Sequence, residues 1–210
     1  MRALTVKEIL SRKRQTFPFA GKWADAFGQP ERKGVWFIWG RSGNGKTSFV
    51  MQLIEELCKY DRVAFDSMEE GDSLSMRQKL VRHGLGKVGS RLHLLNAEPI
   101  DELKERLARR KSYNIIVIDS FQYTQMSYRE YIQFKELNRD KLIIFTSHAK
   151  GSLPRGTSAE GVMYDATLKI WVEGFKAFSK GRFIGPTGEF TIWDEGAARY
   201  WGNTNKSVED

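Results

Sequence analysis

Apolar residues recur along the chain with two different periods, and the alternation between them predicts an α/β domain. Residues 35–39 form a continuous apolar run between glycines, which is typical of a buried strand. In residues 49–57 the apolar positions recur at helical spacing instead. Further strands are expected at 62–66, 91–95, 115–118 and 142–145, with helices at 73–83, from 99 onward, and at 127–138. This order indicates a largely parallel central sheet flanked by helices.

The two ends of the chain show other patterns. We interpret residues 1–33 as a short polar lead-in, with Thr5 and Glu8 at capping-box spacing for a small helix. From Leu168 the apolar residues alternate with period two between glycines, which predicts antiparallel strands at one edge of the sheet. The sequence thus predicts a core domain over residues 34–201, preceded by the lead-in and followed by a polar tail over 202–210.

A glycine-rich segment lies between the first strand and its helix. It fits the pattern G-x-x-x-x-G-K-[ST], whose backbone N–H groups cradle phosphates at a helix N-terminus. The lysine is expected to reach the β- and γ-phosphates, and the threonine hydroxyl to bind Mg²⁺. The expected nucleotide-binding residues are Gly40, Arg41, Ser42, Gly43, Asn44, Gly45, Lys46, Thr47 and Ser48.

Acidic residues follow two other predicted strands. Asp119 comes directly after the apolar run 115–118, where a second metal ligand belongs, so Thr47 and Asp119 are the predicted metal site. Glu69 and Glu70 follow the strand after the glycine loop's helix, and one of them is expected to activate the attacking water. We choose Glu69 as the catalytic base and leave Glu70 as the alternative.

Composition narrows the classes of protein and partner. The 210 residues carry a net charge of +8, which favours polyanionic partners such as nucleic acid. A single cysteine, Cys58, excludes an internal disulfide framework and a cysteine-rich zinc module. Neither a signal peptide nor an apolar run of about 18–20 residues is present, so we expect a cytoplasmic protein without a membrane partner.

Taken in order, four segments resemble the RecA-like ATPases, and specifically the core of the RadA/Sms family, with DnaB-type helicases and KaiC as more distant relatives. The resemblance runs over roughly residues 21–183. Val117-Ile118-Asp119-Ser120-Phe121-Gln122-Tyr123-Thr124 is similar to the RadA segment V-I-D-S-I-Q-T. Residues 63–70 resemble the family's strand that ends in a Glu-Glu-Ser-like motif, 146–150 resemble G-H-V-T-K, and 180–183 resemble K-N-R-F-G.

The resemblance implies an activity and several residue roles. It implies a Mg²⁺-dependent ATPase that acts on DNA, more on single strands than on duplex, in recombination, repair or replication, as a homo-oligomer or ring and possibly together with a replication or repair protein. His148 would sense the γ-phosphate and couple it to a DNA-contacting loop at 150–156. Lys180 and Arg182 would enter the nucleotide site of a neighbouring subunit.

Departures from the family pattern keep other functions open. The chain resembles a core without the zinc module and the Lon-like domain of RadA, and Gly181 replaces an asparagine of the K-N-R-F-G motif. An alternative is an ATP-switched adaptor or helicase loader with slow turnover, for which Glu69 matters less. A small-molecule kinase is disfavoured, because no arginine-rich lid segment is evident.

Overall fold

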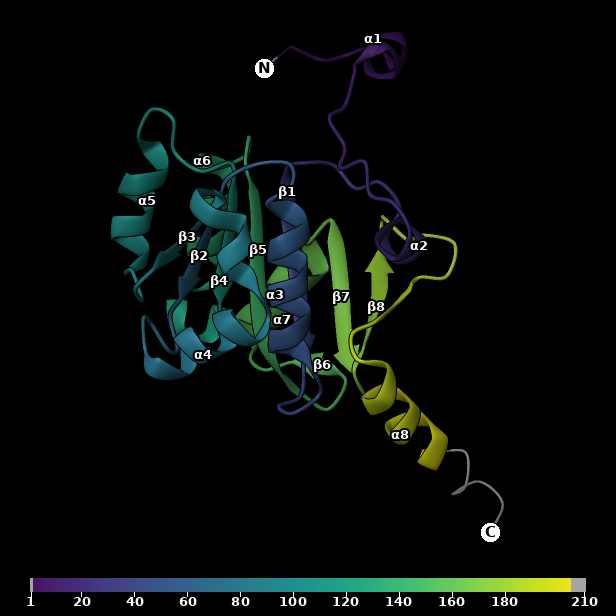
Figure 1. Ribbon diagram of the computed structural model, residues 1–210. Coiled ribbons are helices and arrows are strands. Elements are labelled where there is room, and N and C mark those ends of the chain that lie inside the picture. The colour runs from purple at the N-terminus through teal and green to yellow at the C-terminus, as the bar shows by residue number, and fades with distance from the viewer. Residues whose placement is uncertain (1, 205–210) are drawn as a thin grey trace.

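The computed structural model describes residues 2–204, and the strands of this part of the chain join in one nine-stranded sheet (Figure 1). The strand order is β3-β2-β4-β5-β1-β7-β8-β9, and the short β6 pairs with β5. The strands are β1 (Gly34–Gly40), β2 (Val63–Ser67), β3 (Leu92–Leu95), β4 (Ile115–Asp119), β5 (Leu142–Lys150), β6 (Leu153–Pro154), β7 (Leu168–Glu173), β8 (Lys176–Gly181) and β9 (Glu189–Thr191). The pairs from β3 to β7 are parallel, whereas β7-β8 and β8-β9 are antiparallel, as the sequence predicts.

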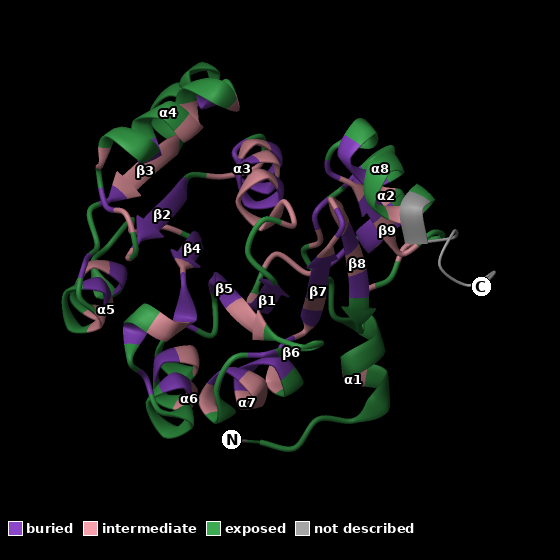
Figure 2. Cartoon of the chain, turned by 90° about the horizontal axis from the view of Figure 1, so that it is seen from below, coloured by how far each residue is buried: buried purple, intermediate pink, exposed green. Residues whose placement is uncertain are grey.

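Helices cover both faces of the sheet. They are α1 (Val6–Ser11), α2 (Lys22–Phe27), α3 (Lys46–Leu57), α4 (Leu74–Arg82), α5 (Ile100–Ala108), α6 (Tyr128–Leu137), α7 (Thr157–Asp165) and α8 (Asp194–Thr204), with the 3-10 helices η1 (Leu85–Arg91) and η2 (Phe121–Thr124). Figure 2 shows α3 and α4 on one face and α5, α6 and α7 on the other. Each face has its own buried cluster, because strands buried on both sides need apolar cover on both.

The parallel strands give the sheet two unlike edges. Connections that follow the strands, including the glycine loop between β1 and α3, lie at the carboxyl edge, at the bottom of Figure 1. Connections that precede the strands, including the chain that enters β1, lie at the amino edge, at the top. We use these two names below, because each candidate functional residue belongs to one edge or the other.

The segment before residue 34 contributes to the core, which differs from the polar lead-in that the sequence analysis expects. Phe17, Trp23 and Phe27 are buried, and Trp23 packs on Phe190 with ring centroids 4.3 Å apart. An isolated antiparallel bridge joins Thr16 to Glu31. These aromatic residues follow no regular period, so the pattern along the chain does not reveal their burial. Helix α1 forms with the predicted capping box and buries none of its residues.

The C-terminal part adds two helices, α7 and α8, that the apolar pattern does not predict. Of the expected tail, residues 202–204 belong to α8, and 205–210 lie outside the described residues. Among the residues with described structure, none of the helices has the length and apolar character needed to cross a bilayer.

Candidate functional site

The glycine loop turns between β1 and α3 with two residues in left-handed backbone conformations. Gly43 has φ +77° and Gly45 φ +93°, a region that side chains disfavour. A Cβ at Gly40 would lie 2.3 Å from the Val172 carbonyl oxygen, so the backbones of β1 and β7 need a glycine there. Helix α3 begins directly at Lys46, with Thr47 in its first turn. The loop therefore has the backbone geometry of a phosphate cradle at a helix N-terminus.

Asn44 fastens this loop to the turn between β7 and β8. Its side-chain oxygen accepts a hydrogen bond from Gly174 N at 2.8 Å, and its carbonyl oxygen accepts one from Phe175 N at 3.1 Å. Its amide nitrogen donates to the Ser42 carbonyl oxygen at 3.1 Å. These bonds fix the loop before any phosphate binds, a role for Asn44 beyond the phosphate contact that the loop motif assigns to it.

Asp119 ends β4 two strands away from the loop, with β5 between them. The Thr146 hydroxyl of β5 donates a hydrogen bond to Asp119 Oδ1, so the carboxylate is held in one orientation. A Mg²⁺ ion prefers oxygen ligands and keeps several of its waters. The Thr47 hydroxyl and an oriented carboxylate at the same edge fit such an ion. The hydroxyl of Thr146 directly after the apolar run 142–145 is the signal by which the sequence could have revealed this contact.

Glu69 and Glu70 differ in what they touch. The Glu69 carboxylate is about two-fifths exposed and lies 3.8 Å from His148 Nε2, across the carboxyl edge. Glu70 instead accepts hydrogen bonds from the Ser75 hydroxyl and from Lys79. Burial alone would raise the pKa of Glu70, but these two donors outweigh it and hold the pKa below its ordinary value. Glu69 is thus the carboxylate that is open toward the site.

His148 is built into a network at the end of β5. Its backbone N–H donates to Gln122 Oε1 at 3.2 Å, and Gln122 Nε2 donates to Ser147 Oγ at 2.7 Å. The His148 carbonyl oxygen accepts from Arg155 N at 2.8 Å. The first residues of the segment 150–156, which the resemblance assigns to a DNA-contacting loop, form a short antiparallel hairpin of β5 and β6, in which Ala149 pairs with Pro154 and Lys150 with Leu153. His148 therefore lies between Glu69 and the base of this hairpin.

Lys180 and Arg182 lie away from the glycine loop of their own chain. Strand β8 runs antiparallel to β7, so its last residues return to the amino edge, where Gly181 pairs with Leu168. Arg182 N donates to the Thr167 carbonyl oxygen, just before β7. The structure thus brings the loop, Asp119, Glu69 and His148 to one edge of the sheet and leaves these two cations at the other.

The chain is similar to known proteins in structure but not in sequence. No family model and no curated protein sequence matches the chain. The flagellar accessory protein FlaH from Methanocaldococcus jannaschii has a similar structure, with a TM-score of 0.60, 17% identity and coverage of 85% of this chain and 92% of that one. The KaiC-like protein PH0186 from Pyrococcus horikoshii OT3 gives a TM-score of 0.60 and 16% identity, covering 85% and 98%. The ATPase domain of G40P gives 0.51 and 16%, covering 72% and 78%.

These likenesses confirm the fold expected from the sequence: a RecA-like α/β fold with a mostly parallel sheet, flanking helices and antiparallel strands at one edge. These structures share 16–17% identity with the chain and show its fold alone, so the resemblance to RecA-like ATPases stays a prediction where activity is concerned. They do not single out RadA/Sms, so that finer resemblance stays a prediction.

Proposed function

We propose that this protein binds ATP with Mg²⁺ and hydrolyses it. The observation that carries this proposal is the meeting of three elements at the carboxyl edge: the glycine loop, the oriented Asp119 carboxylate, and Glu69 beside His148. A nucleotide triphosphate needs a cradle, a metal ligand and a base at one place. The likeness to solved structures that include an ATPase domain supports the same reading.

Each residue has a role in this chemistry. The N–H groups of the glycine loop hold phosphate oxygens, and the Lys46 ammonium offsets the negative charge of the β- and γ-phosphates. Thr47 and Asp119 would hold Mg²⁺, which would supply positive charge to offset the charge that develops on the phosphates. Glu69 accepts a proton from the attacking water. We assign to His148, whose Nε2 lies 3.8 Å from that carboxylate, the role of sensing whether the γ-phosphate is present.

We further propose that the protein acts on DNA, with single strands preferred, in recombination, repair or replication. Gln122, Tyr123, His148 and Arg155 line a hollow of about 360 Å³ beside the β5-β6 hairpin. Tyr123 is 47% exposed, and an exposed aromatic ring next to an arginine suits stacking of an unpaired base. Because His148 belongs to this hollow and also faces Glu69, occupancy by a base and by a nucleotide would be coupled.

The alternative function, an ATP-switched adaptor or loader with slow turnover, is favoured by one observation. Lys180 and Arg182 lie at the opposite edge from the glycine loop, so a lone chain does not bring this pair to its own phosphates. A cation at the transferring phosphoryl group accelerates hydrolysis strongly. A monomer would then bind ATP and hydrolyse it slowly, whereas a ring in which each chain supplies the pair to its neighbour would turn over faster.

One experiment separates these functions. ATP hydrolysis is measured with and without single-stranded DNA over a salt series, for the full chain and for Glu69→Gln. Hydrolysis that DNA stimulates and that Glu69→Gln removes supports the DNA-acting ATPase. Tight ATP binding with slow turnover that DNA leaves unchanged favours the switch. Absence of ATP binding would overturn both proposals.

A further inference from the structure

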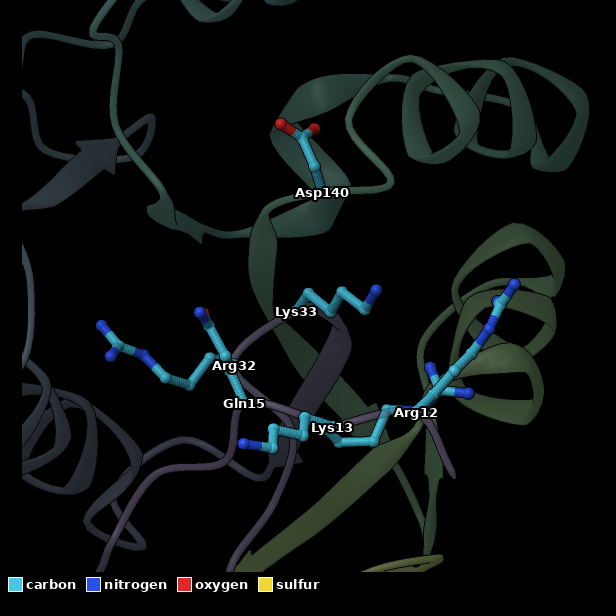
Figure 3. A pocket seen from close by; sticks show the side chains of 7 residues that line it. Arg12, Lys13, Gln15, Arg32, Lys33 and Asp140 are labelled. Carbon is cyan, nitrogen blue, oxygen red and sulfur yellow. The ribbon is translucent and has the colours of Figure 1, made fainter. Parts of the chain in front are cut away.

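Much of the chain's excess positive charge gathers at the amino edge, opposite the candidate nucleotide site. The run Arg12-Lys13-Arg14 is brought beside the start of β1, because Arg32 N donates to the Gln15 carbonyl oxygen and Thr16 bridges Glu31. A hollow of about 510 Å³ opens there. Figure 3 shows its side chains, which come from the N-terminal segment, from the entry to β1 and from the turn before β5. We call its cations, Arg12, Lys13, Arg14, Arg32 and Lys33, the amino-edge cluster.

The members of this cluster differ in whether they already have a partner. Arg14 forms an ion pair with Glu31, with Nε and Oε1 3.7 Å apart. Arg32 is fixed in place, since its guanidinium contacts the Tyr60 carbonyl oxygen at 3.2 Å, the Asp61 carboxylate at 3.5 Å and the face of the Phe17 ring. Arg12, Lys13 and Lys33 are exposed and, within residues 2–204, have neither an ion pair nor a side-chain hydrogen bond. These three charges are therefore available to a ligand.

The positive surface extends along the strand ends beyond the hollow. Arg139 precedes β5, and Arg109, Arg110 and Lys111 precede β4; all four are exposed. In the sheet, β5 lies next to β1 and β4 next to β5, so cations stand at the amino ends of three neighbouring strands. Two strand spacings span about 10 Å. That length matches about three phosphates of one DNA strand, at about 3.4 Å of axis each.

We propose that the amino-edge cluster binds the phosphate backbone of a nucleic acid, at a surface separate from the nucleotide site and without need of ATP. The identity of the polyanion rests on the proposed function. Apart from Gln15 and Asp140, charged cationic side chains line the hollow, and it has no aromatic ring on which a base could stack. Binding at this surface is electrostatic and independent of the nucleotide sequence, because contacts to phosphates carry no sequence information.

A lipid surface is a different partner with the same charge, and the structure favours it less. Membrane-surface helices bury a broad apolar face beside their basic residues. The neighbouring helix α1 does expose Val6, Ile9 and Leu10, but it has six residues, about 9 Å of helix, and carries Glu8 in its first turn. The apolar surface of α1 is small for a membrane anchor. A row of cations along neighbouring strand ends instead matches the row of phosphates in a linear polymer.

The test removes the three available charges and leaves the fixed Arg32 in place. We compare Arg12→Gln/Lys13→Gln/Lys33→Gln with a control, Arg77→Gln/Arg82→Gln/Lys87→Gln, which removes three positive charges from α4 and η1. Binding of labelled single-stranded DNA is measured without ATP over a salt series, beside basal ATP hydrolysis. The amino-edge variant should bind about tenfold more weakly at low salt, and its slope of log K against log salt should fall by about 2–3. Its basal hydrolysis and the control's DNA binding should match the wild type.

A second variant tests the same surface by an expected gain, rather than a loss, of DNA affinity. Asp140 is the acidic residue that lines the hollow, and its carboxylate repels phosphate. Asp140→Asn should tighten DNA binding about two- to threefold, an effect that misfolding does not produce. Unchanged or weaker binding by this variant would count against the proposal.

The remaining outcomes separate this inference from the proposed function. Equal DNA binding by the two triple variants overturns the amino-edge surface, while DNA-stimulated hydrolysis by the wild type would leave the proposed function standing. A different result is that the wild type binds phosphatidylserine vesicles but not DNA, and that the amino-edge variant loses the vesicle binding. This result would overturn both the choice of nucleic acid as the partner and the proposed action on DNA. ATP hydrolysis would then stand alone.

Discussion

The two edges of the sheet carry opposite chemistry. At the carboxyl edge the candidate functional side chains are few and held by hydrogen bonds, as Asp119 is by Thr146 and Asn44 by Gly174. At the amino edge the cations are many and exposed. Helix dipoles explain part of this difference, because α5 and α6 end at the amino edge, where negative helix C-termini favour cations such as Arg109 and Arg139. Helix dipoles do not explain the charges of residues 12–14, which lie in the N-terminal segment, or the charge of Lys33, which directly precedes β1.

Lys46→Ala is expected to give the largest effect on ATP hydrolysis and to distinguish the functions of the two edges most clearly. Removing the ammonium from the phosphates should lower ATP hydrolysis about a thousandfold. DNA binding without ATP should stay within about twofold of the wild type, because the amino edge is untouched. Steady-state hydrolysis and DNA titrations on one folded preparation measure both. Near-normal hydrolysis would remove the glycine-loop assignment, and equal loss of DNA binding would show that the edges are not independent.

Glu69→Gln should slow hydrolysis about a hundredfold or more while ATP binding remains, the scale of a lost general base. Glu70→Gln is the matched control at the neighbouring position, since Glu70 is already engaged by Ser75 and Lys79. Single-turnover hydrolysis and nucleotide titration distinguish binding from chemistry. A larger loss in Glu70→Gln would reverse the assignment of the base but keep the site at this edge.

Asp66, in β2 near the carboxyl edge, should make stability depend on pH. Burial raises the pKa of this carboxyl to about 6, outweighing the hydrogen bond from Glu98 N–H. A carboxyl whose pKa is higher in the folded state destabilises the fold as pH rises from about 4 through 6. Asp66→Asn should therefore raise the free energy of unfolding by about 2 kcal/mol at pH 8 and little at pH 4.

Urea unfolding at both pH values measures this difference, with the exposed Asp101→Asn as a control that should leave the pH dependence unchanged. A gain of the same size at pH 4 and pH 8 would contradict the role of Asp66 ionisation.

Thr146→Val should weaken the metal site without touching the glycine loop. The variant keeps the volume of the side chain and removes the hydroxyl that orients Asp119. Loss of such a supporting hydrogen bond typically costs about tenfold or more in metal affinity. The Mg²⁺ concentration for half-maximal hydrolysis should rise by about that factor, and Thr146→Ser should restore it. An unchanged Mg²⁺ dependence would mean that Asp119 does not bind the metal.

The smallest effect concerns whether the two edges meet between subunits. A Lys180→Ala/Arg182→Ala protein and a Glu69→Gln protein are each expected to be inactive. In an equal mixture, about a quarter of the interfaces of a ring would combine an intact glutamate with an intact cation pair. Hydrolysis should then recover to about that fraction of the wild type. Mixtures that stay inactive, together with turnover independent of protein concentration, would remove the ring and favour the switch.

The sequence predicted the regular core and the candidate loop because both depend on local patterns. Buried strands and amphipathic helices appear as apolar periods. Strands β1 and β4 formed within one residue of their predicted bounds, and β5 begins where predicted but continues past residue 145 to Lys150. The glycine loop depends on backbone conformations that only certain residues adopt, so Gly43 and Gly45 were visible in the chain. Helix α2 and the buried Phe17 escaped prediction, since irregular aromatic contacts have no period.

What only the tertiary structure decided is which side chains share an edge. The sequence favoured Glu69 and kept Glu70 as the alternative, and their contacts, Glu69 with His148 and Glu70 with Lys79, are visible only in the structure. The direction of β8 sets Lys180 and Arg182 apart from Lys46, and the bridge from Thr16 to Glu31 brings residues 12–14 beside Lys33. Strand order and direction arise from packing between distant segments, which no local pattern encodes. The composition gives the net charge of +8 but not the positions of those charges on the surface.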